Sequence, residues 1–258
     1  IDGLTTGVVT ASISETDAST LATVTDANGN NDYTATITTA SVDASVFNGI
    51  SNVIANLTDG GVTTLTETAA DFAEVNTALT GGVLNGNEAV TITGDITAVN
   101  VSTILNNTSG VVTATISSDT AANLNSNLTN TSGNDALTLT VTNTPTDAAD
   151  LVALNGKTSV NVNAASISLL TGTIAQVQAA YTANTAGTIT GLGDEAVTVT
   201  DVTLSSTDLN SLDLNTSGTI TLSNATTINV ANGETLNLNN FTLSNSVTIN
   251  DSTGNENI

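Results

Sequence analysis

The sequence predicts a mainly β protein, an elongated parallel β-solenoid of stacked coils with short helices at some corners. A strand-like stretch occurs three times, as TTGVVTASIS, TSGVVTATIS and TSGTITLSNA, with Gly7, Gly110 and Gly218 spaced by 103 and 108 residues. In each copy Val or Ile alternates with Thr or Ser, a pattern typical of a strand with one buried face. Strand patterns return roughly every 20 to 26 residues, which is the length of one solenoid coil. Such a coil buries its apolar face only by stacking on its neighbours.

The repeats predict three parts. Residues 1–109 form a first long repeat, residues 110–217 a second, and residues 218–258 a shorter-period β repeat that is a truncated third copy. The first two align closely, because Gly7, Leu21 and Asp32 match identical residues, Gly110, Leu124 and Asp135, each 103 positions later.

In the first repeat, the alternation predicts strands over 8–14 and from Tyr33, separated by a loop over 26–32. A short helix is predicted over 41–50, ending near Gly49 as helices often do. A second helix is predicted over 66–82, because Thr68 and Asp71 have capping-box spacing and Gly81 follows its last turn. A strand over 89–93 and an amphipathic turn over 96–107 complete the repeat.

In the second repeat the same elements are expected, with Pro145 as the first residue of a helix capped by Thr144. The third part has strand-like pieces every eight or nine residues and no helix pattern. One stretch resembles a leucine-rich repeat, because Leu209, Leu212 and Leu214 are followed by an asparagine. An α/β solenoid similar to leucine-rich repeats is therefore the alternative fold.

Charge excludes several classes of function. The chain has 24 acidic residues and one basic residue, Lys157, with a net charge of −23. Nucleic acids and anionic membrane surfaces would repel it, and it contains no apolar run long enough to insert into a bilayer. Without His or Cys there is no base or thiol nucleophile, so we expect no catalytic activity. Glu88 and Glu195, each just before a strand, are expected to mark charged coil corners.

One loop has the side chains that calcium prefers. Asp26, Asn28, Asn30 and Asp32 place oxygen-bearing side chains at alternate positions, and hard cations bind several such oxygens on a flexible turn. The alternative interpretation is an Asx-rich turn between strands. Because a charge of −23 opposes compaction, calcium bound to the folded state is expected to stabilise it.

Thr-x-Thr pairs recur along the chain, for example at Thr34 and Thr36 and at Thr198 and Thr200. Stacked in a flat solenoid face they would form hydroxyl ladders, the arrangement used by ice-binding solenoids. The alternative explanation is the high strand propensity of threonine. Because the coils differ in length, such ladders are expected to lose their register.

Three features together resemble the large, repetitive, acidic surface proteins of bacteria, namely biofilm-type adhesins and S-layer-like proteins of cyanobacteria and other marine bacteria. They are the three T-[TS]-G stretches, the acidic Thr/Asn-rich composition and the ending DSTGNENI. That ending is similar to hemolysin-type calcium-binding repeats, with Gly254, Asn255, Asn257 and Ile258 fitting the pattern and Glu256 replacing an Asp. The resemblance implies secretion to the cell surface, calcium binding, and further calcium repeats downstream.

The function that follows from this resemblance is structural: the building block of an extracellular surface layer or filament, or the stalk of a repetitive adhesin. A carbohydrate- or surface-binding adhesin module and an ice-binding solenoid are the alternatives. Neither end of the chain, at Ile1 or Ile258, has a capping pattern, and the chain does not begin with Met. The expected partners are therefore copies of the chain, stacked head to tail or in a lattice, or the remainder of a longer chain.

Overall fold

The structure, a computed structural model, describes residues 5–143 and 145–251 and shows a mixed α/β protein. Helices make up 26% and strands 29% of it. The prediction of an elongated, mainly β solenoid is therefore wrong, because a helix accompanies the strands in most coils instead of occupying some corners. The alternative α/β fold similar to leucine-rich repeats is compatible with this content and stays a prediction.

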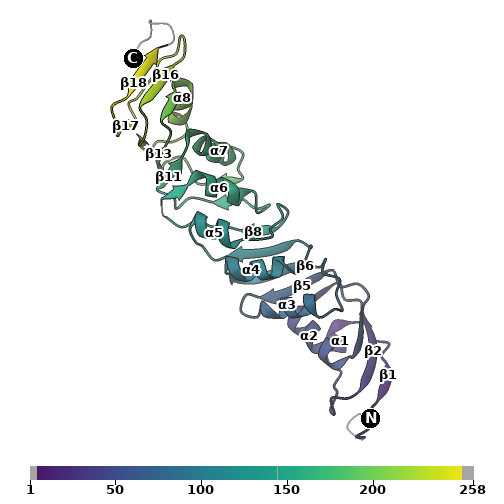
Figure 1. The fold of residues 1–258 in the computed structure, drawn as a ribbon. Helices are drawn as coiled ribbons and strands as arrows, with labels where there is room; N and C mark the ends of the chain where they lie inside the picture. Colours follow the sequence, from purple (N-terminus) through teal and green to yellow (C-terminus); the bar gives the residue numbers. More distant parts are fainter. Residues whose placement is uncertain (1–4, 144, 252–258) are drawn as a thin grey trace. The chain divides into compact units, whose positions relative to one another are not determined.

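The described residues contain eight helices and eighteen strands (Figure 1). The helices are α1 (Ala18–Leu21), α2 (Ala44–Val53), α3 (Ala73–Thr80), α4 (Ala98–Leu105), α5 (Ala121–Asn127), α6 (Ala148–Asn155), α7 (Ile174–Thr185) and α8 (Ser206–Asp213). The strands are β1 (Thr10–Ser12), β2 (Asp32–Ile37), β3 (Ser41–Asp43), β4 (Asn56–Asp59), β5 (Thr64–Thr68), β6 (Ala89–Ile96), β7 (Val112–Ile116), β8 (Ala136–Thr138), β9 (Thr146–Asp147), β10 (Val162–Asn163), β11 (Leu169–Gly172), β12 (Ile189–Thr190), β13 (Ala196–Val199), β14 (Thr203–Ser205), β15 (Ile220–Leu222), β16 (Thr227–Val230), β17 (Phe241–Leu243) and β18 (Thr248–Asp251).

The chain forms two compact units. Unit 1 comprises residues 1–117 and 128–137, and unit 2 comprises residues 118–127 and 138–258. Sheets β1-β2-β4 and β3-β5-β6-β7-β8 belong to unit 1. Sheets β17-β15-β13-β11-β9, β14-β16-β18 and β10-β12 belong to unit 2. The strand pairs with a defined register in the described residues are all parallel, as expected for coils that stack.

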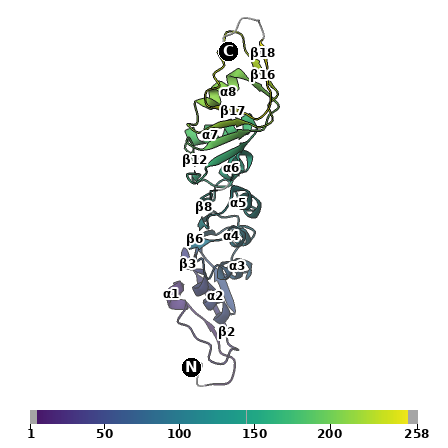
Figure 2. The same cartoon turned by 90° about the vertical axis from the view of Figure 1, so that its left-hand side faces the viewer.

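Most helices follow one sequence pattern. An Asp, Thr or Ser caps the first turn. The first, fourth and seventh residues of the helix are then buried, and this spacing places them on one helical face. Asp43, for example, accepts a hydrogen bond from the Val46 backbone N–H at 3.1 Å. The buried sets include Ala44, Phe47 and Ile50 of α2, Ala98, Val101 and Ile104 of α4, and Ala148, Leu151 and Leu154 of α6. In unit 1, α2, α3 and α4 form a row beside the strands (Figure 2).

Three predicted helix boundaries are wrong. Helix α2 continues through Gly49 to Val53, because burial of Phe47, Ile50 and Ile54 outweighs a cost of about 1 kcal/mol for a glycine inside a helix. Thr68 ends strand β5, and α3 begins five residues later without a side-chain cap. Helix α6 begins at Ala148, where Asp147 caps it, so Pro145 lies outside the helix.

Other predicted elements are present. Strands β2 and β6 occupy the predicted positions, and β1 is shorter than the predicted strand. After α8 the described residues, up to Asp251, contain strands and no helix, as the third part predicts. Leu209 and Leu212 lie on helix α8, and Leu214 is 88% exposed beyond it. The expected cap Thr144, the end at Ile1 and the nonapeptide-like residues 252–258 lie outside the described residues.

Candidate functional site

The predicted calcium loop folds as a turn closed by its own carboxylate. Asp26 accepts hydrogen bonds from the backbone N–H of Gly29 at 2.8 Å and of Asn31 at 3.0 Å, and from the Asn31 side chain at 2.7 Å. The bond from the Asn31 backbone is the main cause that lowers the pKa of Asp26 below its ordinary value. Asn28 belongs to the same turn through its backbone N–H, 3.2 Å from Asp26. The turn is the Asx-rich structure that the sequence also allowed.

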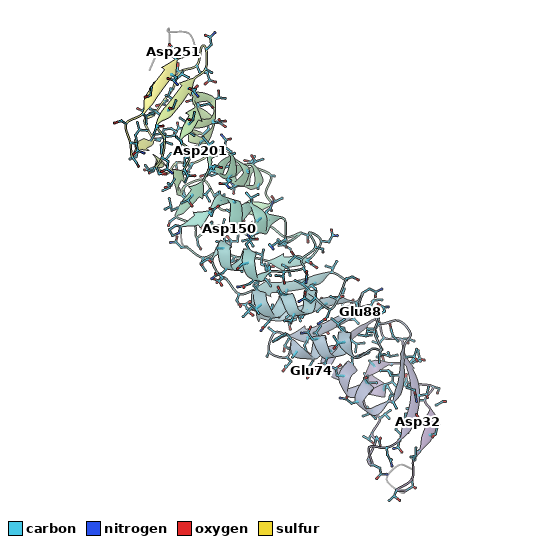
Figure 3. The ribbon with its side chains drawn as sticks, viewed as in Figure 1. Asp32, Glu74, Glu88, Asp150, Asp201 and Asp251 are labelled. Atoms are coloured by element: carbon cyan, nitrogen blue, oxygen red, sulfur yellow. The ribbon has the colours of Figure 1, made fainter. Side chains whose placement is uncertain are left out.

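Asp32 has a different partner. It lies on β2, labelled in Figure 3, and accepts a hydrogen bond from the Asn56 side chain of β4 at 2.6 Å. Asn30 is exposed in the turn between Asp26 and Asp32. Within residues 5–143 and 145–251, no group of three or more His, Cys, Asp or Glu side chains could hold a metal ion. Calcium binding at this loop stays a prediction.

A better-defined polar site is the corner before β6, where the T-S-G stretch meets the preceding coil. The Thr108 hydroxyl donates to the Glu88 carbonyl at 2.6 Å and accepts from the Gly110 backbone N–H at 2.9 Å. Ser109 donates its backbone N–H to the carbonyl of Gly86 at 2.8 Å. The T-S-G stretch therefore joins two successive coils of unit 1.

The carboxylate of Glu88, a residue labelled in Figure 3, is hydrogen-bonded to the backbone of the same corner. Its residue is fully buried, and its two carboxylate oxygens accept from the backbone N–H groups of Asn85 at 3.1 Å and Gly86 at 3.0 Å. Glu88 therefore lies at a coil corner, as expected, and the corner buries its side chain. A buried carboxylate is stable only with such partners.

Unit 2 repeats the corner. Thr216 donates to the Glu195 carbonyl at 2.7 Å and accepts from the Gly218 backbone N–H at 2.9 Å. Glu195 is also buried, and its carboxylate accepts from the backbone N–H of Gly193 at 2.7 Å and from the hydroxyl of Tyr181 on α7. The recurring G-[ND]-E before a strand, with T-S-G one coil later, was the sequence signal for these sites.

Burial raises the pKa of the Tyr181 hydroxyl well above its ordinary value, and the hydrogen bond to Glu195 and the negative charge of that residue add to the shift. Because the folded pKa is raised, the stabilisation by Tyr181 is complete below the unfolded pKa of 10.0 and is lost as the pH rises above it. The protein should therefore unfold more readily in strong alkali.

Replacing Tyr181 with Phe tests this corner. At neutral pH the variant should be about 1.5 to 3 kcal/mol less stable, because a buried bond to a carboxylate is lost. Above pH 10 the difference in the free energy of unfolding between variant and wild type should become smaller, since phenylalanine does not ionise. Urea unfolding at neutral and alkaline pH measures both effects. A gap that stays constant with pH would contradict the assigned role of the hydroxyl.

Asparagine and glutamine side chains link successive helices within each unit. In unit 1 the Asn48 amide donates to the Glu74 carbonyl at 2.9 Å, and the Asn76 amide donates to Thr103 at 2.9 Å. In unit 2 the Asn125 amide donates to Asp150 at 3.0 Å. These bonds cross from one coil to the next, so much of the polar composition serves the stacking of coils.

Among the hollows of unit 2, two differ from a typical ligand site in their lining. One, of about 290 Å³, is lined by Ser217, Thr219, Asn239, Asn240 and Phe241. The other, of about 400 Å³, lies over α6 and α7 and is lined mostly by alanine. The first has a single aromatic ring and the second has almost no polar group, so neither has the combination of features typical of a ligand site.

Comparisons with protein-family models, with curated proteins and with solved structures find no match to this chain. In the described residues, no helix is both long enough and apolar enough to span a bilayer. The proposals below therefore rest on the geometry of this chain alone.

Proposed function

We propose that this protein is a structural building block, whose coils extend by stacking on the coils of a second copy. The observation that carries the proposal is the outer strand layer of unit 2, on which no further strand of the described residues lies. Strands β17 and β18 are the outermost members of their sheets in the described residues. Their neighbours β15 and β16 pair with strands on both sides.

The apolar side chains of this outer layer are only partly buried. Leu243 is 41% exposed, whereas Leu222, which occupies the same register position one strand earlier, is fully buried. Ile249 is likewise half-buried beside fully buried Ile228. A further strand beside β17 would cover Leu243 in the way that Leu243 covers its register partner Leu222. It would also pair the free backbone edge of β17.

A second copy provides such a layer at β1. This strand is the outermost member of the first sheet of unit 1, and the nearby Val8 is 62% exposed. Joining two different edges gives a head-to-tail contact, and repetition of this contact from copy to copy builds a filament or an open lattice when the rotation between copies does not close a ring. That product agrees with the surface-layer or filament role that the sequence resemblance implies.

The net charge sets the conditions for this contact. Copies that each carry −23 repel one another at low ionic strength. Salt shortens the range of the repulsion to about 8 Å at physiological strength, and divalent cations act at lower concentrations. Association is therefore expected in salt or calcium and not in dilute buffer.

Leu243→Lys tests the proposal. The substitution places a charge in the apolar layer and removes a leucine whose full burial is worth about 1.5 to 3 kcal/mol, so association should weaken at least about tenfold. Sedimentation velocity over a wide range of protein concentration, with and without calcium, measures the effect. Thr182→Lys, on the exposed face of α7, adds the same charge away from the edge and should associate like wild type.

Two outcomes would contradict the proposal. One is a wild-type protein that stays monomeric at high concentration in both salt and calcium. The other is equal association of wild type and Leu243→Lys, which would place the contact on another surface.

A further inference from the structure

One sheet face of unit 2 presents an ordered array of hydroxyl groups. Thr171, Thr198, Thr221 and Thr242 lie at the same register position of four neighbouring parallel strands, β11, β13, β15 and β17. The residues on either side of each threonine point to the opposite face, and those of the first three strands are buried or nearly so. The four threonines therefore form one straight row on the outer face of the sheet.

A second row lies beside the first. The backbone N–H groups of Thr200, Ser223 and Ser244 donate to the carbonyls of Gly172, Val199 and Leu222, so the alignment continues past the strand ends. The second row consequently lies just beyond the strand ends and consists of Thr173, Thr200, Ser223 and Ser244, each two residues after a threonine of the first row. In the first row, which lies within the strands, the hydroxyl groups thus repeat about 4.8 Å apart from strand to strand.

The register is kept although the coils differ in length. The difference in length lies in helices such as α7, which has twelve residues where α8 has eight, and in the loops beside them. The strands themselves pair without a shift from β11 to β17. The expectation that unequal coils would break the ladders is therefore wrong for this sheet.

The two rows contain no charged side chain, although the protein as a whole is highly acidic. None of the eight positions in the two rows is acidic. Asp147, opposite Thr171, borders the array, and its carboxylate caps α6. Asp201 follows Thr200 but accepts a hydrogen bond from the Ile174 backbone at 2.7 Å (Figure 3).

The central hydroxyls are available to an external partner. In the described part of the chain, Thr198, Thr221 and Thr242 have no hydrogen bond through their side chains to the protein. Three hydroxyls at the margins of the array have partners in the protein. Ser223 donates to the Val199 carbonyl at 3.0 Å, Thr171 donates to the Thr146 carbonyl at 3.3 Å, and Thr173 accepts from the Gln176 backbone N–H at 3.3 Å as the cap of α7. Each free threonine offers one donor and two acceptor sites to water, with a methyl group beside them.

We propose that this face, the threonine array of Thr171, Thr198, Thr221 and Thr242 with the row beside it, binds the surface of ice. Ice prism planes present rows of water oxygens whose repeat is close to the spacing of neighbouring strands, so water held between the methyl groups and hydroxyls of the first row would match such a row. A carbohydrate partner would need aromatic rings for stacking. None of the eight positions is aromatic, and Phe241, next to Thr242, points to the opposite face of β17. A charged mineral would need carboxylates, which the two rows lack.

The test is partition of the full chain into slowly grown polycrystalline ice, against an acidic globular reference protein in the same solution. Wild type should be enriched in the ice fraction, and the reference should stay in the liquid. Thr198→Tyr should lose the enrichment, because a large ring in the centre of the array breaks its flat surface while tyrosine keeps high strand propensity. Thr221→Tyr provides a second disruption, and melting of each variant by circular dichroism establishes that it is folded.

Thr182→Tyr, on the exposed face of α7, is the matched control and should partition like wild type. Leu243→Lys should also keep the enrichment, which separates ice binding from the association proposed above. Wild type that stays in the liquid with the reference would overturn the proposal. So would folded Thr198→Tyr and Thr221→Tyr variants that enter the ice as wild type does.

Discussion

Gly110→Ala is expected to destabilise unit 1 by about 3 kcal/mol or more, at the upper end of the cost of overpacking. A Cβ atom at this position would lie 2.3 Å from the carbonyl oxygen of Glu88 and 2.6 Å from that of Asn87. Both are backbone atoms, so no side-chain rotation relieves the clash. The coils would have to separate, and the hydrogen bond from the Gly110 N–H to Thr108 would lengthen.

Gly49→Ala is the matched control in the same unit. Gly49 lies inside helix α2, and a Cβ there meets no atom within 4 Å. Alanine is favoured over glycine by about 1 kcal/mol in a helix, so this variant should be more stable than wild type. Urea unfolding followed by circular dichroism measures both substitutions. A Gly110→Ala variant as stable as wild type would mean that the two coils do not approach each other at this corner.

The periodicity of the sequence predicts the strands well. Alternation of Val, Ile and Thr identifies β2 and β6, and the three T-S-G-type stretches identify the coils. The parallel pairing follows from the repeat, because coils of similar length return each strand to the same side. These features depend on local pattern, which a single sequence contains.

The helices were harder to predict because they are short and poor in strong helix formers. Helix α8 has the sequence STDLNSLD, and isolated helices of eight residues are not stable in water. Packing of Leu209 and Leu212 in the core stabilises it instead. The available signal was the cap followed by a buried small residue, as at Asp43-Ala44 and Asp147-Ala148.

The polar sites show a second limit of sequence-based prediction. The acidic loop residue Asp26 suggested a cation site, but backbone N–H groups of its own turn occupy the carboxylate. Glu88 suggested a charged coil corner, and the sequence did not reveal that the chain buries its side chain. In both cases the partners are backbone N–H groups, whose direction depends on the turn and does not appear in the sequence.

Glu88→Ala should lower the stability of unit 1 by about 3 to 5 kcal/mol, because two backbone N–H groups would be left in a buried corner without partners. These are the N–H groups of Asn85 and Gly86, which now donate to the carboxylate. The cavity left by the side chain adds to the loss. Glu88→Gln keeps the shape and one acceptor oxygen, so its free energy of unfolding should lie between that of wild type and that of Glu88→Ala.

Glu15→Ala is the control that isolates the effect of burial. Glu15 also accepts hydrogen bonds from two backbone N–H groups, those of Thr16 at 2.8 Å and Asp17 at 2.9 Å, but it does so in an exposed position. Water can replace its carboxylate, so the cost should stay below about 1 kcal/mol. Urea unfolding and hydrogen exchange of the Asn85 and Gly86 amides measure the difference. If Glu88→Ala and Glu15→Ala lower the free energy of unfolding by the same amount, the Glu88 carboxylate does not stabilise the corner. Water must then reach the amides of Asn85 and Gly86, which donate to Glu88 in the wild type.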